Sequence, residues 1–259
     1  MDRELVQDMC GRMISVARKP RRIVSLVPSQ TELLYDLGLD DEVVGITKFC
    51  VHPESWFRSK KRVGGTKTVH LEIVRGLNPD LIIANKEENT EEQIEELATQ
   101  FPVWVSDIRN VAEARQMIRE VGRLVGRETK ADELARAVEN GFKELQQAFI
   151  PKRVAYFIWR DPWMCAGGDT FISDMIREAG WVNALADLDR YPAIQLDELT
   201  QRNIDLILLS SEPYPFRDKH IAEIQEVLPD VAIQLVDGEL FSWYGSRMLL
   251  APAYFKTLI

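Results

Sequence analysis

The sequence predicts an α/β fold with two Rossmann-like lobes, each built on a parallel sheet, and a ligand cleft between the lobes. The main support is a fragment that occurs twice, as Leu71–Ile83 and as Leu196–Leu208. Each copy has the pattern of a short helix that runs through an Asn and an Asp into a buried apolar strand, which is a helix-then-strand unit of a parallel sheet. A second pair, Leu33–Gly38 and Met175–Gly180, consists of apolar helix ends that stop at glycine. Loops of two such lobes that face each other would hold a small ligand.

In the first lobe, short apolar runs rich in β-branched residues alternate with helical patterns, as expected for a parallel sheet covered on both faces. The predicted strands are Ile23–Val27, Val43–Ile46, Leu81–Ala84 and Val103–Val105. Ser29 and Glu32 after the first strand have the spacing of a capping box, so we expect the next helix to start there.

One uninterrupted helix, Glu128–Phe149, separates the lobes. It carries an apolar face at three- and four-residue steps, formed by Leu134, Val138, Phe142, Leu145 and Phe149. A helix in this position predicts a rigid brace with limited hinge motion, unlike a connection made of Gly and Ser. We therefore expect a first lobe over residues 1–127, a connecting helix over 128–150 and a second lobe over 151–259.

The second lobe begins with a predicted strand at Arg153–Trp159, and a glycine turn then opens a helix at Phe171–Ala179. The second copy of the repeat follows, and a last strand is expected at Ala232–Val236. The stretch Asp237–Arg247 is aromatic but rich in turn residues, which a buried strand would not need. We place this stretch at the loop end of the sheet, facing the cleft.

Composition and charge exclude several classes of protein. The chain has 259 residues, 46% hydrophobic and 28% charged, which is typical of a globular protein. A formal net charge of -9 and a pI near 5.0 argue against a nucleic-acid partner. No apolar stretch has the length of a membrane-spanning helix, and the N-terminus lacks the apolar core of a signal peptide. The sequence as written predicts a cytoplasmic protein, or a periplasmic or cell-surface protein if a leader is missing from this chain.

The motifs of common enzyme classes are absent from the sequence. It contains no Gly-x-Gly-x-x-Gly, no phosphate loop, no Gly-x-Ser-x-Gly elbow and no His-Glu-x-x-His. The three cysteines, Cys10, Cys50 and Cys165, show no pairing or metal-site spacing. We interpret Cys50 and His52 as a thiol and an imidazole at the edge of the cleft rather than as metal ligands. The sequence therefore predicts no enzyme, no cofactor and no metal site.

Aromatic and arginine side chains follow the predicted strands. Large planar rings at the loop ends of sheets suit a large, flat or apolar ligand, whose anionic groups Arg160 or Arg247 could bind. The alternative is that these rings pack between the lobes, and for Trp159 the two interpretations are equally supported. The candidate ligand-binding residues are Phe49, Trp159, Arg160, Trp163, Phe241, Trp243, Tyr244 and Arg247.

Several spaced motifs together resemble one known family. These are residues 8–12, the run Pro20–Leu34, Gly38, the segment Val63–Gly65, and residues 71–82 with their Asn-Pro-Asp; Trp243–Arg247 carries most of the similarity in the second lobe. The chain is similar over almost its whole length to the substrate-binding proteins of iron-siderophore and vitamin B12 ABC importers. The resemblance implies two Rossmann-like lobes joined by one long helix, with a metal chelate bound between them.

The resemblance also implies roles for individual residues. An acidic residue on the outer surface of each lobe would dock onto arginines of the permease: Glu72 on the first lobe, and Asp197 or Glu198 on the second. Pro28, Phe49, Trp159 and Arg247 lie near positions that contact ligand in the B12 binders. Where some B12 binders have tryptophans, this chain has Thr66-Lys67 and Asn85-Lys86, which leaves the identity of the ligand open.

These observations predict a non-enzymatic, monomeric protein that binds a metal chelate, a corrinoid or a ferric siderophore, and delivers it to an ABC permease. The chelate is the ligand, and neither nucleic acid nor membrane insertion is expected. The alternative is a leaderless cytosolic enzyme or carrier on the same fold, such as a chelatase-like protein that handles tetrapyrroles or metal.

Overall fold

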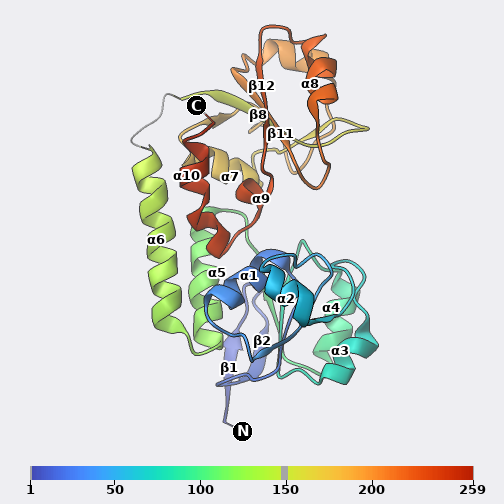
Figure 1. Cartoon of the computed structure of the whole chain (residues 1–259), viewed down its shortest axis with the longest axis vertical. Helices are drawn as coiled ribbons and strands as arrows, with labels where there is room; N and C mark the ends of the chain where they lie inside the picture. The colour runs from blue at the N-terminus through green and yellow to red at the C-terminus, as the bar shows by residue number, and fades with distance from the viewer. Residues whose placement is uncertain (1, 147–150, 259) are drawn as a thin grey trace. The chain divides into compact units, whose positions relative to one another are not determined.

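The computed structural model describes residues 2–146 and 151–258. The chain forms two compact units (Figure 1). Unit 1 comprises Met1–Ile108, Glu113–Ala137 and Tyr244–Arg247, and unit 2 comprises Arg109–Ala112, Val138–Trp243 and Met248–Ile259. Each unit contains its own parallel sheet, which confirms the predicted α/β class. The predicted lobe boundaries and the cleft between the lobes stay predictions.

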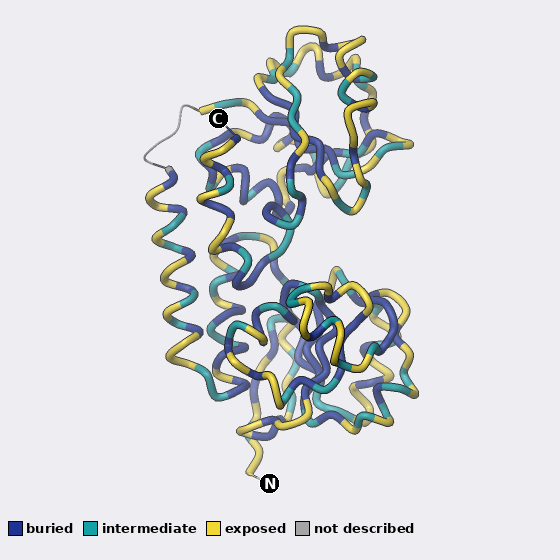
Figure 2. Tube along the Cα trace, viewed as in Figure 1, coloured by how far each residue is buried: buried dark blue, intermediate teal, exposed yellow. Residues whose placement is uncertain are grey.

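Unit 1 is built on a parallel sheet with the strand order β5-β4-β3-β6-β7. Its strands are β3 (Ile23–Ser25), β4 (Val43–Ile46), β5 (Lys61–Arg62), β6 (Leu81–Asn85) and β7 (Val103–Ser106). The predicted strands are confirmed to within two residues at each end, and the sequence pattern missed only β5 among the described strands of this sheet. β3 and β6 are buried along their whole length (Figure 2), as expected for central strands covered on both faces.

An antiparallel hairpin of β1 (Arg3–Gln7) and β2 (Met13–Ala17) precedes this sheet and was not predicted. The Met9 N–H donates to the Val105 carbonyl at 3.1 Å, and the Arg12 guanidinium donates to the Val103 carbonyl at 3.0 Å. The hairpin turn therefore covers part of β7, an edge strand whose unpaired backbone would otherwise be exposed.

The helices of unit 1 occupy the connections between its strands. They are α1 (Pro28–Asp36), α2 (Glu54–Ser59), α3 (Leu71–Leu77) and α4 (Glu91–Ala98), followed by α5 (Val111–Leu124) and α6 (Glu128–Gln146), which also contain residues of unit 2. The predicted capping box is wrong. Helix α1 begins at Pro28 with Val27 as an N-cap that provides no side-chain bond, so Ser29 lies inside the helix. Glu32 pairs with Arg247 instead.

Helix α6 confirms the long helix over its described part. Ala131, Ala135, Val138, Phe142 and Leu145 form its buried face, whereas Leu134 is half-buried. Residues 147–150, including the predicted helix end at Phe149, lie outside the described residues. The division into two units passes through this helix, between residues 137 and 138.

Unit 2 has a parallel sheet with the order β10-β8-β11-β12, and β9 adds antiparallel to β8. The strands are β8 (Arg153–Trp159), β9 (Met164–Cys165), β10 (Val182–Asn183), β11 (Leu206–Ser210) and β12 (Ala232–Val236). The helices are α7 (Phe171–Glu178), the 3-10 helix η1 (Leu196–Gln201), α8 (Asp218–Gln225), α9 (Glu239–Ser242), the 3-10 helix η2 (Ser246–Leu249) and α10 (Ala251–Phe255). The predictions of β8 and β12 are confirmed residue for residue.

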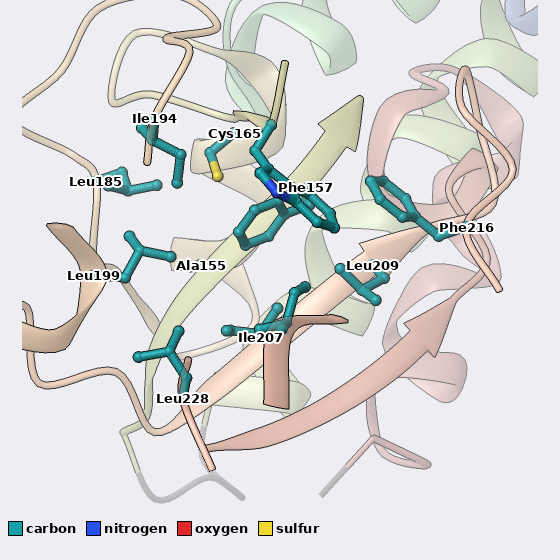
Figure 3. Close-up of a cluster of buried hydrophobic side chains, with 12 residues drawn as sticks. Ala155, Phe157, Cys165, Leu185, Ile194, Leu199, Ile207, Leu209, Phe216 and Leu228 are labelled. Atoms are coloured by element: carbon teal, nitrogen blue, oxygen red, sulfur yellow. The ribbon is translucent and has the colours of Figure 1, made fainter. Parts of the chain in front are cut away.

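One cluster of buried side chains in unit 2 lies on a single face of this sheet. Side chains from β8 and β11, among them Phe157 and Leu209, gather there with Phe216 from the following loop (Figure 3). The Phe157 and Phe216 rings meet edge to face with their centroids 6.5 Å apart, a favourable aromatic geometry. This packing fixes the carboxyl ends of β8 and β11, which carry the candidate site residues.

The two copies of the repeated fragment adopt matching backbone conformations. Asn78 and Asn203, at equivalent positions, have left-handed φ values of 45° and 50°, which asparagine tolerates better than most residues. The carboxylate of Asp80 accepts the N–H groups of Arg21 and Arg22 at 2.8 Å each. At the equivalent position, Asp205 accepts the N–H of Arg153 at 2.7 Å.

The arginine side chains complete this shared arrangement. Arg22 donates to the Leu77 carbonyl at 2.8 Å, and Arg153 donates to the Arg202 carbonyl at 3.1 Å. In both units an aspartate thus holds the start of the first parallel strand next to the start of a neighbouring strand, β6 in unit 1 and β11 in unit 2. The sequence repeat therefore corresponds to a repeated clamp at the amino ends of the sheets.

We expect Asp80→Ala to lower the free energy of unfolding by about 1–3 kcal/mol, because two strand amides lose a charged acceptor. Asp80→Asn retains one acceptor oxygen and should cost less. Urea denaturation of both variants measures the difference, with Asp41→Ala as the control, since Asp41 is an exposed residue of the same unit. Equal stability of Asp80→Ala and the control would show that the clamp contributes nothing.

Candidate functional site

The strand order of unit 1 creates a topological switch point between β3 and β6. The chain proceeds from β3 to β4 and β5 on one side, and then to β6 and β7 on the other. Connections that leave neighbouring strands in opposite directions open a crevice at their carboxyl ends, where ligands bind in such sheets. The candidate site therefore begins with the residues that follow β3, β4 and β6.

A buried polar cluster lies under this edge where β3 leads into α1. The Thr31 hydroxyl lies 2.7 Å from Ser25 Oγ and 3.1 Å from the Cys50 sulfur, and Thr47 Oγ1 is also 3.1 Å from that sulfur. Burial raises the pKa of the Cys50 thiol, so it remains a neutral hydrogen-bonding group. The Cys50 side chain is fully buried, and its predicted place at the edge of a cleft stays a prediction.

Amide side chains from the β6 loop extend the polar cluster. Asn85 donates to Ser106 Oγ at 3.0 Å, and Asn89 donates to the carbonyls of Leu26 and Thr66 at 3.3 and 3.0 Å. These bonds tie the loops after β3, β5, β6 and β7 together. A floor held in this way is pre-organised, so little ordering is needed when a ligand binds.

Phe49 is a large apolar residue exposed next to this cluster, with its backbone N–H donating to Thr47 Oγ1 at 3.3 Å. It follows β4, its side chain is 50% exposed, and Lys48 Nζ lies 5.0 Å from its ring centroid. Gly65 permits the ring to lie close to the neighbouring loop, since a β-carbon there would come within 3.2 Å of the Phe49 ring. An exposed ring that packs against its neighbouring loop in this way is suited to stacking on a ligand.

The lysines of the β5 and β6 loops have acceptors within their own unit. Lys86 pairs with Asp107 at 2.8 Å, and Lys67 donates to the Glu87 carbonyl. Burial raises the pKa of Glu88, while the nearby Lys67 lowers it.

The segment Tyr244–Arg247 packs against α1 as part of unit 1. Arg247 forms a bidentate ion pair with Glu32, at 2.7 and 2.8 Å, and the side chains are 10% and 16% exposed. Gly245 adopts a φ of 111°, a conformation that is strained for a residue with a side chain. A β-carbon at this position would also lie 3.2 Å from the Ser29 carbonyl oxygen. Tyr244 is 8% exposed, so this segment is held tightly against the start of α1, beside the half-buried Pro28.

In unit 2, Trp159 is the last residue of β8 and is 40% exposed. Its ring meets Tyr214 edge to face at 5.6 Å. The neighbouring Arg160 pairs with Glu223 at 2.9 Å, pairs with Asp161, and lies 4.3 Å from the Trp163 ring centroid. Trp159 is therefore available at the surface, whereas Arg160 is engaged by carboxylates of its own unit.

Two of the predicted ligand-binding aromatics belong to the core of unit 2. Trp163 is 9% exposed and stacks on Phe216 with the ring planes 1° apart. Phe241 is fully buried, lies in α9 rather than in a loop, and packs against Tyr156 and Phe255 at 4.9 and 4.4 Å. We assign both to the support of the site rather than to its surface.

Glu212 organises the loops after β11 and β12. Its carboxylate accepts the Trp243 indole N–H and the Ser242 hydroxyl, both at 2.9 Å. Trp243 is half-buried, and this bond fixes the orientation of its indole. An open hollow of about 520 Å³ adjoins these loops, lined by Ser211, Glu212, Leu235, Val236, Asp237 and Glu239. The carboxyl end of this sheet therefore presents an acidic depression.

The predicted docking acids are exposed in both units. The Glu72 side chain is 85% exposed in the first turn of α3 and pairs with Arg75, which also pairs with Glu96 of α4. The hydrogen bonds that Arg75 donates to Glu96 and then to Glu72 raise the pKa of Arg75. Asp197 and Glu198 are both exposed in the first turn of η1. The equivalence of α3 and η1 in the repeat matches Glu72 with Asp197 by position.

The structure thus brings most of the predicted residues to the carboxyl ends of the strands. Sequence patterns missed Lys48, Glu32, Glu212 and Tyr214, which contact predicted residues directly. Glu212 and Tyr214 follow β11 closely, so their position after a predicted strand was a usable signal. Across residues 2–146 and 151–258, no cluster of three or more His, Cys, Asp or Glu is placed to hold a metal ion. None of the helices in those ranges combines the length and apolar character needed to span a membrane.

Comparisons with known proteins agree with this architecture. A profile of the periplasmic binding proteins matches residues 23–229. The ABC transporter substrate-binding lipoprotein YvrC of Bacillus subtilis is 29% identical over 78% of this chain and 68% of its own length. The vitamin B12-binding protein of Yersinia pestis is 25% identical over 91% of this chain and 85% of its own. The structure of the periplasmic heme-binding protein HutB of Vibrio cholerae superposes with a TM-score of 0.80 at 21% identity, covering 93% of this chain and 99% of that one.

The Glu32–Arg247 pair generates a stability prediction. We expect Glu32→Gln and Arg247→Met each to lower the free energy of unfolding by about 1–3 kcal/mol, because each leaves a largely buried charge without its partner. The double variant should cost less than the sum, with a coupling energy of about 1 kcal/mol or more. Urea denaturation of the four proteins measures this coupling, and strict additivity would show that the pair contributes no interaction energy.

Proposed function

The chain belongs to the periplasmic binding protein family, and we propose that it is a non-enzymatic receptor for a metal chelate that it delivers to an ABC permease. The observation that carries the proposal is the placement of exposed aromatic rings at the carboxyl ends of both parallel sheets. Phe49 provides such a ring in unit 1 and Trp159 in unit 2. Large flat chelates bury much of their area against rings of this kind.

The ligand class follows from the relatives together with the site. Proteins of similar sequence or fold are described as binding vitamin B12 or heme, and both ligands are large planar metal chelates. The buried network of Thr31, Cys50 and Asn89 keeps the floor next to Phe49 rigid. A preformed site gains affinity because binding orders few additional side chains. We accordingly propose a corrinoid, a ferric siderophore or a related chelate as ligand.

The family also supports the choice between a receptor and an enzyme. The relatives are substrate-binding proteins, one of them a lipoprotein of an ABC transporter. This favours the receptor over the chelatase-like alternative. We propose that the protein acts outside the cytoplasmic membrane, in the periplasm or at the cell surface, because its relatives are named as periplasmic binding proteins or as a lipoprotein.

The proposed binding role predicts that Phe49→Ala and Trp159→Ala each weaken chelate binding roughly tenfold, since each removes an aromatic contact area. The test is a titration of purified protein with cyanocobalamin, a ferric hydroxamate and heme, followed by chelate absorbance and tryptophan fluorescence. Leu5→Ala is the control, because Leu5 is 70% exposed and lies in the hairpin β1–β2. The proposal fails if none of the chelates binds saturably.

The proposed docking role predicts that the triple variant Glu72→Ala, Asp197→Ala, Glu198→Ala binds chelate normally but supports roughly tenfold less uptake, because permease arginines lose their partners. Uptake of radiolabelled chelate in cells measures this effect. The matched control replaces Glu133, Glu226 and Asp230, three acids that are also exposed, and keeps the same net charge. Equal uptake by the two triple variants would rule out docking through these acids.

A further inference from the structure

We infer that the protein selects a chelate that has no net negative charge and discriminates against chelates that carry carboxylates. This inference rests on the proposed function and narrows it. Its basis is the pairing of the charged residues in each unit that follow strands or were predicted to bind ligand. Corrinoids, which are fringed by amides, and ferric hydroxamates, which are neutral or cationic, meet this requirement. Heme, which carries two propionates, does not.

The first observation concerns Arg247, which the sequence offered as a partner for an anionic ligand. Both carboxylate oxygens of Glu32 accept from its guanidinium, at 2.7 and 2.8 Å. The two side chains are 10% and 16% exposed, so the bidentate pair is largely shielded from water. A ligand carboxylate would have to displace Glu32 and leave a nearly buried carboxylate without its cation, which is unfavourable.

Arg160 is engaged in the same way in unit 2. Glu223 accepts from Arg160 at 3.0 and 2.9 Å, and Asp161 accepts a further bond. The guanidinium also lies over the Trp163 ring, 4.3 Å from its centroid. Two carboxylates already neutralise this arginine and its geometry is fixed by the aromatic contact, so it offers little attraction for a ligand anion.

The lysines of unit 1 also offer little attraction for a ligand anion. Lys86 pairs with Asp107 at 2.8 Å, and Lys67 lies by Glu87 and Glu88. Lys48 lies over the Phe49 ring, 5.0 Å from its centroid. A single exposed ammonium of this kind is strongly hydrated and contributes little to the binding of an anion in water.

Unit 2 adds repulsion for anions. Glu212, Asp237 and Glu239 line the hollow beside β11 and β12, and its other lining residues, Ser211, Leu235 and Val236, are uncharged. A ligand carboxylate near this edge would meet charges of its own sign, whereas amide N–H groups or an ammonium would find acceptors. The net charge of -9 for the whole chain acts in the same direction.

The test compares ligands that differ mainly in charge. Cyanocobalamin and its monocarboxylic derivative, in which one peripheral amide is hydrolysed to a carboxylate, share one shape. Ferrioxamine B and heme extend the series to a cationic and a dianionic chelate. We expect the protein to bind cyanocobalamin or ferrioxamine B more tightly than heme, and the carboxylate derivative roughly threefold to tenfold more weakly than cyanocobalamin.

Every outcome of this titration has a defined meaning. Heme binding that equals or exceeds that of the other chelates overturns the inference and leaves the proposed receptor function intact. Equal affinity for cyanocobalamin and its carboxylate derivative also overturns it. Saturable binding of none of the ligands overturns the proposed function and, with it, this inference.

A variant tests the contribution of the acidic hollow directly. Glu239→Gln should raise the affinity for the carboxylate derivative about threefold relative to cyanocobalamin, because one like charge is removed. Glu95→Gln is the control: Glu95 is exposed on α4 of unit 1, and the substitution changes the net charge by the same amount. An identical shift in both variants would assign the effect to net charge and contradict the role of the hollow.

Discussion

The shared direction of the strands within each sheet is the constraint on which the rest of the structure depends. Parallel strands gather all their carboxyl ends at one edge, so the loops that follow β3, β4 and β6 in unit 1 lie together. The aspartate clamps act at the opposite edge. Asp80 and Asp205 hold the amino ends of adjacent strands in register, which fixes where those strands end. The position of Trp159, the last residue of β8, is thus decided partly by Asp205 at the opposite edge of the sheet.

The sequence predicted those parts of the fold whose signal is local. Strands such as β4, β8 and β12 are continuous apolar runs with β-branched residues, and the repeat identified α3 and η1 with the strands after them. Two-residue strands such as β5 and β10 were missed, because two residues cannot display a periodicity. The hairpin β1–β2 was missed because it forms a separate small sheet in which apolar side chains are not consistently buried. Leu5 and Met13, for example, are exposed.

The sequence indicated where along the chain the candidate site residues lie better than it indicated which of their side chains are exposed. The helix-then-strand repeat gives the strand direction, so it predicted that aromatic residues near strand ends lie at the carboxyl edge; Phe49 follows β4 in a loop, whereas Phe241 lies in α9. Whether a ring there is exposed depends on three-dimensional packing, and no spacing reveals it. Phe241 and Phe49 are alike in the sequence, yet one is fully buried and the other half-exposed. Likewise, Glu32 and Arg247 are separated by 215 positions, so no local pattern could have shown that they pair.

The internal pairing of the arginines explains how a strongly acidic protein can bind a ligand without relying on charge. An arginine that a carboxylate already neutralises contributes rigidity, since the ion pair holds the segment Tyr244–Arg247 against α1. Affinity must then come from area buried against the rings and from hydrogen bonds to uncharged groups, and both depend on shape. In the charge selection proposed above, acids such as Glu212 would repel anionic ligands, and such repulsion supplies specificity without adding affinity. Under the proposed function, charge would therefore act on ligand choice mainly through repulsion, and the aromatic surfaces would act on binding strength.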